Sequence, residues 1–183
     1  MTATNAEEAS PPVRVVLLTG DGRGKTTSAL GLALRAAGHG RRVCWLQFVK
    51  GRQDTGEWRG LALLPGVEAV PCGLGFVPPP DSTAYARHRA AAQEGLRQAR
   101  ERLTDPRVDM VVLDEICVAV ARGLLTEQAV LEALDAAHPG AVAVLTGRDA
   151  APALLARADT ASRIENLKHA LDSGREAQAG VEW

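Results

Sequence analysis

The sequence predicts a doubly wound α/β fold built on a mostly parallel β-sheet. Short apolar runs rich in Val and Leu alternate with longer segments rich in Ala, Leu and Arg, as strands and helices do in this fold class. The runs are apolar throughout, which is typical of parallel strands covered on both faces. Ligands bind such sheets at the carboxyl ends of the strands, so the segments that follow the strands are expected to share one edge: 20–27, 50–57, 73–81, 114–115 and 147–148.

The first elements follow from local pattern. Residues 13–19 are a continuous apolar run and predict the first strand, and residues 25–38 are a helix rich in Ala and Leu that ends at glycine. Residues 42–49 predict a second strand. The polar segment 50–60 is expected to be a loop that leaves the carboxyl end of that strand.

The middle of the chain predicts two further strands around a long helix. Residues 67–71 are a short strand, and residues 73–82 are irregular because consecutive prolines remove backbone donors and fix φ. A helix rich in Ala, Arg and Gln is expected over 83–103. Residues 109–113 are an apolar strand that ends at a pair of acidic residues.

The last part of the chain repeats the alternation. Thr126 is the expected N-cap of a helix, because its hydroxyl can accept a hydrogen bond from a free backbone N–H of the first turn. The remaining expected elements are a helix over 126–137, a strand over 141–146, a helix over 150–157, a strand over 160–165 and a polar tail over 166–183.

Length and charge limit the partners that can be expected. At 183 residues the chain predicts one domain over 13–183, preceded by a short disordered segment over 1–12. A net charge of −1 predicts neither a nucleic-acid partner nor an anionic membrane surface. The N-terminus does not resemble a secretory signal, and three cysteines without metal-ligand spacing are expected to be reduced thiols, so a cytoplasmic location is expected: Cys44, Cys72 and Cys117.

The segment 13–27 carries the strongest functional signal. A strand, a Gly-rich turn and a helix N-terminus follow one another, and this order builds a cradle of backbone N–H groups for phosphate. Lys25 can reach the outer phosphates of a nucleoside triphosphate, and the Thr26 hydroxyl can bind Mg²⁺. Thr19 occupies the first glycine position of the general motif. The loop residues expected to bind the nucleotide are Gly20, Asp21, Gly22, Arg23, Gly24, Lys25, Thr26 and Thr27.

Asp114 and Glu115 are expected to complete the nucleotide site. They end an apolar strand at the same edge of the sheet, where carboxylates can bind Mg²⁺ directly or through water. An exposed acidic turn is the alternative interpretation. Arg148 follows another strand, and it either adds a cation near the phosphates or forms a surface ion pair.

Aromatic and basic residues near this edge allow two interpretations. Trp45 and Phe48 lie in a strand and are expected in the core, whereas Trp58 lies in a polar segment and either stacks on a ligand or packs within its loop. Lys50, Arg52 and Arg59 either bind polar groups of a substrate or form an ordinary solvated face.

Two segments together resemble one known family. The segment TGDGRGKTTSALGLALRAAGHGRRV and the closing KHALDSGREAQAGVEW, with VVLDEI and LTGRDAAPALLARAD between them, are similar to the P-loop type of cob(I)alamin adenosyltransferases, also called corrinoid adenosyltransferases. The resemblance extends from about residue 13 to residue 183. It implies the RecA-like topology of P-loop nucleotide-binding proteins.

The resemblance also implies a reaction and its participants. Co(I) of a reduced corrinoid attacks the 5′ carbon of ATP, which gives the adenosylcobalt product and triphosphate. The matching residues imply that the glycine loop holds the triphosphate, that Thr26 and Glu115 hold Mg²⁺ or Mn²⁺, and that the segments 47–58 and 73–81 contact the nucleoside and the corrinoid. The family further implies a homodimer and a flavin-dependent reductant protein.

Two positions depart from the family pattern. Asp21 stands where Asn is common, and Pro78 stands where the corrinoid loop usually has Trp, although Phe76 is retained. These departures leave an alternative open, in which an ATP-binding protein acts as a switch, a scaffold or a phosphotransferase without corrinoid chemistry.

Overall fold

The computed structural model describes residues 12–51, 54–170 and 174–181. Its centre is a six-stranded sheet in which every pairing is parallel. The strand order is β3-β2-β4-β5-β1-β6. The strands are β1 (Arg14–Thr19), β2 (Val43–Gln47), β3 (Val67–Pro71), β4 (Met110–Asp114), β5 (Val142–Thr146) and β6 (Thr160–Arg163).

The strand order confirms the predicted RecA-like topology. β5 lies between β1, which leads into the glycine loop, and β4, which ends at the acidic pair. The register aligns Leu18 of β1 with Thr146 of β5, and Leu113 of β4 with Leu145 of β5. The carboxyl ends of these three strands therefore lie side by side at one edge.

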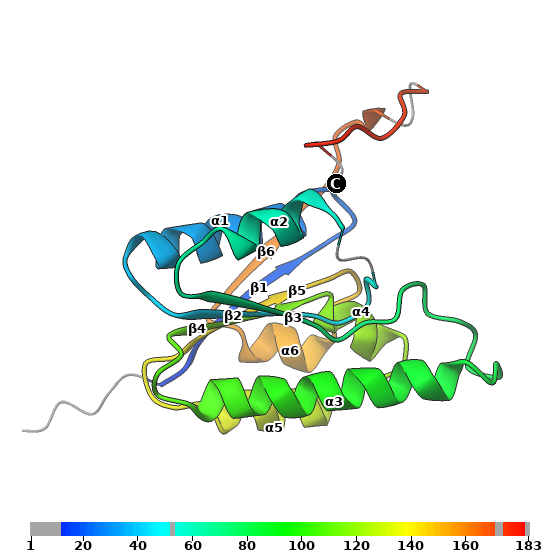
Figure 1. The fold of residues 1–183 in the computed structure, drawn as a ribbon. Coiled ribbons are helices and arrows are strands. Elements are labelled where there is room, and N and C mark those ends of the chain that lie inside the picture. Colours follow the sequence, from blue (N-terminus) through cyan, green and yellow to red (C-terminus); the bar gives the residue numbers. More distant parts are fainter. Residues whose placement is uncertain (1–11, 52–53, 171–173, 182–183) are drawn as a thin grey trace, which may run out of the picture.

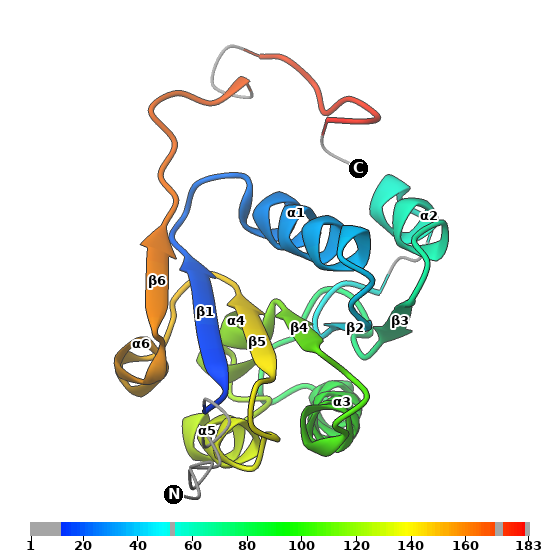
Figure 2. The same ribbon diagram turned by 90° about the vertical axis from the view of Figure 1, so that its left-hand side faces the viewer.

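Helices cover both faces of the sheet (Figures 1 and 2). The α1 helix (Lys25–Gly38) and the α2 helix (Gly56–Ala62) lie on one face. The opposite face is covered by α3 (Tyr85–Thr104), α4 (Ile116–Ala121), α5 (Glu127–Asp135) and α6 (Pro152–Arg157).

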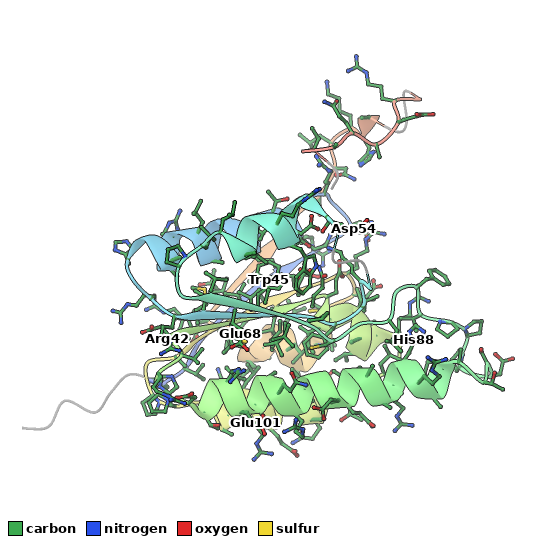
Figure 3. The ribbon with its side chains drawn as sticks, viewed as in Figure 1. Arg42, Trp45, Asp54, Glu68, His88 and Glu101 are labelled. Atoms are coloured by element: carbon green, nitrogen blue, oxygen red, sulfur yellow. The ribbon has the colours of Figure 1, made fainter. Side chains whose placement is uncertain are left out.

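The strands supply apolar side chains to a core on each face. In β2, Cys44 and Leu46 pack into the core under α3, whereas Val43 and Trp45 pack into the core under α1. Trp45 lies between the sheet and the α1–α2 layer (Figure 3). The predicted core positions of Trp45 and Phe48 are confirmed, since both are fully buried. Burial on both faces explains why the central strands β2, β4 and β5 are mainly apolar, whereas the edge strand β6 (TASR) is exposed.

Two short helices differ from the predictions. The segment 50–60 is not wholly a loop, because α2 begins at Gly56 and buries Leu61 against the sheet. The sequence did not predict α2 because two of its seven residues are glycines, which disfavour helix. The α4 helix was not predicted because its sequence, ICVAVA, is short and as apolar as a buried strand. Elsewhere the bounds shift by a residue or two, and the predicted Thr126 cap is confirmed by a bond from Ala129 N–H.

The C-terminal tail leaves β6 and passes over the N-terminal end of α1 toward the side of α2 (Figure 2). The predicted disordered segment falls, except for residue 12, outside the described residues, as do Arg52 and the closing Glu182–Trp183 of the family motif. Within the described residues, no helix combines the length and apolar character that crossing a membrane requires.

Candidate active site

The glycine loop joins β1 to α1 at the edge of the sheet. Gly20 has φ of 96° and Gly24 has φ of 117°, both in the left-handed region that glycine adopts without steric cost. Lys25 begins α1, and its Nζ donates hydrogen bonds to the carbonyl oxygens of Gly20 and Gly22, each at 2.7 Å. Burial, with the nearby Arg148 charge as a second cause, lowers the pKa of Lys25.

The tail holds the outer side of this loop. Gly22 N–H donates to Ile164 O at 2.8 Å, and Arg23 N–H donates to Asn166 Oδ1 at 2.9 Å. A Cβ on Gly22 would lie 2.6 Å from backbone atoms of Ile164 and Glu165, so the tail requires glycine there. We expected successive loop N–H groups to point at an anion. In this structure those of Gly22 and Arg23 instead bind the tail.

Asp114 is fully buried beneath the loop and organises its surroundings. Its Oδ1 accepts hydrogen bonds from the hydroxyls of Thr26 at 3.0 Å and Thr146 at 2.7 Å. Its Oδ2 accepts from Gln47 Nε2 at 3.1 Å. This carboxylate therefore connects the start of α1 with the ends of β2, β4 and β5.

Glu115 directs its carboxylate into the site from an unusual backbone conformation. Its φ is 62°, and its N–H donates to Thr146 Oγ1 at 2.9 Å. A left-handed residue with a side chain is uncommon and marks a position that the surrounding structure must hold in place. Burial, and next the charge of Asp114, raises the pKa of Glu115, whereas nearby Lys50, Lys25 and Arg148 oppose this rise.

Lys50 is a site residue whose role the sequence did not decide. Its Nζ donates to Thr26 Oγ1 at 3.1 Å and lies 3.5 Å from Asp114 Oδ2 and 4.0 Å from Glu115 Oε1. The sequence allowed substrate binding or a solvated face, and the structure places the ammonium beside two carboxylates. One feature of the sequence indicated that Lys50 belongs to the site: it directly follows a predicted strand, at the edge of the sheet where ligands are expected.

Lys25, Lys50 and Glu115 line a cavity of about 830 Å³. Of the predicted site residues, it is lined by 21–27, Glu115 and Arg148. Helix α2 contributes Gly56, Glu57 and Gly60 to its wall, and the tail contributes Asn166, His169 and Val181. Two chain segments far apart in sequence therefore enclose the mouth of the glycine loop.

The predicted aromatic residues do not line this cavity. Trp58 is half-buried on α2, and its indole N–H donates to Gln47 Oε1 at 2.8 Å, which links it through Gln47 to Asp114. Phe76 lies between β3 and α3 and is 90% exposed. Gly20 and Asp114 are not among the residues that line the cavity.

The oxygen atoms near the acidic pair are suitable ligands for a metal ion that also binds phosphate. Among the described residues, His, Cys, Asp and Glu form no cluster of three or more that could hold a metal alone. Mg²⁺ is commonly held by one or two carboxylates, with substrate phosphates and water as its other ligands. Thr26, Asp114 and Glu115 offer one hydroxyl and two carboxylates for this purpose, and Lys50 already presents a positive charge to all three.

A family comparison identifies the kind of enzyme that this site serves. The family model described as "ATP:corrinoid adenosyltransferase BtuR/CobO/CobP" matches residues 13–183. The chain belongs to the ATP:corrinoid adenosyltransferase family.

Curated members of this family are similar over most of their length. The corrinoid adenosyltransferases of Escherichia coli K12 and Salmonella typhimurium are each 38% identical over 169 residues, which is 92% of this chain and 85% of the relative. That of Pseudomonas aeruginosa is 38% identical over 173 residues, 93% of this chain and 84% of the relative. A transferase of this family uses ATP and a corrinoid, and the cavity lies within the roughly 300–1,000 Å³ typical of small-molecule sites.

Proposed function

We propose that this adenosyltransferase moves the 5′-deoxyadenosyl group of ATP to Co(I) of a corrinoid and releases triphosphate. The observation that carries the proposal is that Lys25, Thr26 and Glu115 line one cavity and that the buried Asp114 is hydrogen-bonded to Thr26. This arrangement supports binding of a polyphosphate and its metal in a chain that belongs to this family.

Lys25 is proposed to release its loop carbonyls and bind the triphosphate. Its two bonds to the carbonyl oxygens of Gly20 and Gly22 satisfy a buried ammonium group. A phosphate oxygen offers a charge-assisted bond, which is roughly twice as strong as a neutral one. The exchange therefore favours the bound state. Arg148, at the same cavity, is proposed to neutralise further charge on the triphosphate.

Thr26, Asp114 and Glu115 are proposed to hold Mg²⁺ or Mn²⁺. Bound there, the metal would neutralise charge on the triphosphate as the leaving group departs. Asp114 is fully buried and also accepts the Thr26 and Thr146 hydroxyls, so it orients the Thr26 oxygen. Glu115, at the cavity wall, is the more accessible carboxylate.

The chemistry needs alignment and charge neutralisation rather than a protein nucleophile. Co(I) supplies the electron pair of the new Co–C bond, and the pair of the broken C5′–O bond leaves with the triphosphate. The reduced cobalt is itself a strong nucleophile, so no proton has to be removed to activate it. Positioning and preorganised positive charge are then the contributions of Lys25, Arg148 and the start of α1.

The corrinoid side of the proposal rests on the exposed loop between β3 and α3. Phe76 is available there to contact a large planar ligand, and Trp58 is proposed to support the same side from α2. We further propose a cytoplasmic homodimer that receives electrons from a flavin-dependent reductant protein. Three buried free thiols support a reducing compartment, and the 99% exposed Leu167 supports burial of the tail against a second copy.

One incubation separates this proposal from its alternatives. Protein, ATP, Mg²⁺ and chemically reduced cobalamin are mixed, and both the corrinoid spectrum and the nucleotide products are measured. We expect the adenosylcobalt spectrum and one triphosphate per product. ADP would indicate a phosphotransferase, and tight ATP binding without any product would indicate a switch or scaffold. Cobinamide in a parallel reaction reports which class of corrinoid is accepted.

A further inference from the structure

Lys50 lies beside the oxygens that are proposed to bind the metal ion. It follows β2, and its Nζ faces oxygens of three residues that come from α1 and from the end of β4: Thr26, Asp114 and Glu115. These are the same oxygens that are proposed to bind the metal. Gln47 and Thr146 complete the surroundings of Asp114 through its two oxygens.

Within the described residues, Lys50 supplies the ammonium group that is hydrogen-bonded to Thr26 and Asp114. Lys25 is directed to the carbonyls of Gly20 and Gly22 instead. Asp114 is fully buried and Glu115 is mostly buried, and two adjacent carboxylates in that environment require a neighbouring positive charge. Lys50 meets this requirement.

We propose that Lys50 is an internal counter-ion that occupies the metal position in the nucleotide-free protein, so that divalent metal binds tightly only together with nucleotide. The inference rests on the proposed function, because it assumes that Thr26, Asp114 and Glu115 are the metal site. The inference gives Lys50 a role that the proposed function does not include: it couples the binding of metal to the binding of nucleotide.

Exclusion is the physical basis of the coupling. Mg²⁺ binds oxygen at about 2.0–2.1 Å, and Lys50 Nζ lies 3.1 Å from the same Thr26 oxygen. Two cations that share this oxygen would lie at most about 5 Å apart, so their repulsion favours the departure of one. A Lys side chain can swing on its flexible stem, and this one is 39% exposed toward the cavity.

The nucleotide gives the displaced ammonium a destination. Without nucleotide, displacement of Lys50 exchanges one carboxylate-bound cation for another and leaves the ammonium to solvent. With triphosphate in the glycine loop, Lys50 can bind a phosphate oxygen while the metal takes its former position. By linkage, nucleotide then strengthens metal binding and metal strengthens nucleotide binding by the same factor.

Manganese binding without nucleotide tests this directly. Free Mn²⁺ is followed by electron paramagnetic resonance during titration of the full chain, wild type and Lys50→Met. We expect Lys50→Met to bind Mn²⁺ at least about tenfold more tightly than wild type. Arg107→Met is the matched control: Arg107 pairs with Asp105 before β4, at the other end of that strand, and its loss removes one positive charge there. It should bind Mn²⁺ like wild type.

A double variant establishes where the gained metal binds. Glu115→Gln added to Lys50→Met should remove the gain in affinity. Equal or weaker Mn²⁺ binding by Lys50→Met overturns the proposal, and so does a gain that persists without Glu115. Lys50→Gln repeats the test if Lys50→Met fails to fold. ATP binding by wild type with Mg²⁺ is measured in parallel, and its absence would reject the proposed function independently of the Mn²⁺ result.

Discussion

At Gln47, one isosteric substitution should cause a loss of stability that depends on pH. Its amide is 1% exposed, accepts the Trp58 indole N–H through Oε1 and donates through Nε2 to Asp114 Oδ2 at 3.1 Å. Both contacts fix the orientation of the amide. Gln47→Glu keeps the shape and the Trp58 contact but places a second carboxylate against Asp114.

The size of the effect follows from this distance. Two unit charges 3.1 Å apart repel by about 5 kcal/mol at an effective dielectric constant of about 20. Lys50, 3.5 Å from the same Asp114 oxygen, offsets part of this repulsion. The repulsion that is left cannot exceed the cost of protonating the introduced carboxyl, because the protonated form carries no charge. For a glutamic acid of ordinary pKa about 4.3, that cost is about 4 kcal/mol at pH 7. We therefore expect Gln47→Glu to be about 3–4 kcal/mol less stable than wild type at pH 7.

The sign of the pH dependence follows from the repulsion, which is expected to raise the pKa of the introduced carboxyl in the folded variant. Below the unfolded pKa, about 4.3, the new side chain is protonated and can donate to Asp114 as the amide did, so the stability difference is small. As pH rises from there toward the folded pKa, the variant loses stability relative to wild type by about 1.4 kcal/mol per pH unit.

Urea unfolding of both proteins between about pH 4.5 and 8 measures this difference. Gln47→Met is the control, because it removes both hydrogen bonds without adding a charge and should be destabilised equally at every pH. A difference between Gln47→Glu and wild type that does not change with pH would refute the reasoning. It would mean that the two side chains are not held together in the folded protein.

Three further predictions concern the nucleotide loop, the α3 contact and the corrinoid loop. Lys25→Ala should weaken ATP affinity by about 10- to 100-fold in calorimetric titration, because a charge-assisted hydrogen bond contributes about 1.5–3 kcal/mol. Gly95→Ala should lower the free energy of unfolding by about 1–3 kcal/mol, because its Cβ would lie 2.6 Å from Cys72 Cβ. Pro78→Trp should raise turnover in assays that start from Co(II), because it restores the aromatic pair with Phe76.

Each of these has a result that contradicts it. Near-normal ATP affinity in Lys25→Ala would remove the loop from nucleotide binding. Gly31→Ala is the control for Gly95, since an added Cβ there meets nothing within 4 Å and should stabilise α1 by about 0.5–1 kcal/mol. Equal effects at the two glycines would reject the packing argument. No gain from Pro78→Trp would mean that the loop handles the corrinoid without that aromatic.

The sequence by itself determined the elements whose signals are local. The glycine loop was readable because a strand, three glycines, Lys25 and Thr26 follow one another without interruption. The central strands were readable because burial on both faces makes them apolar up to their carboxyl ends, where Gln47, Asp114 and Thr146 stand. Their order was not in the pattern: it followed from the resemblance, and the described pairing confirmed it.

Only the tertiary structure decided how the site is held together. Trp58, Gln47 and Asp114 form one hydrogen-bonded chain, and the tail through Ile164 binds a loop that precedes it by more than a hundred residues. Such contacts leave no periodic trace, because they join residues that the parallel sheet brings to one edge from distant parts of the chain. For the same reason Lys50, one basic residue among many in the sequence, was recognised as the charge beside the acidic pair only after folding.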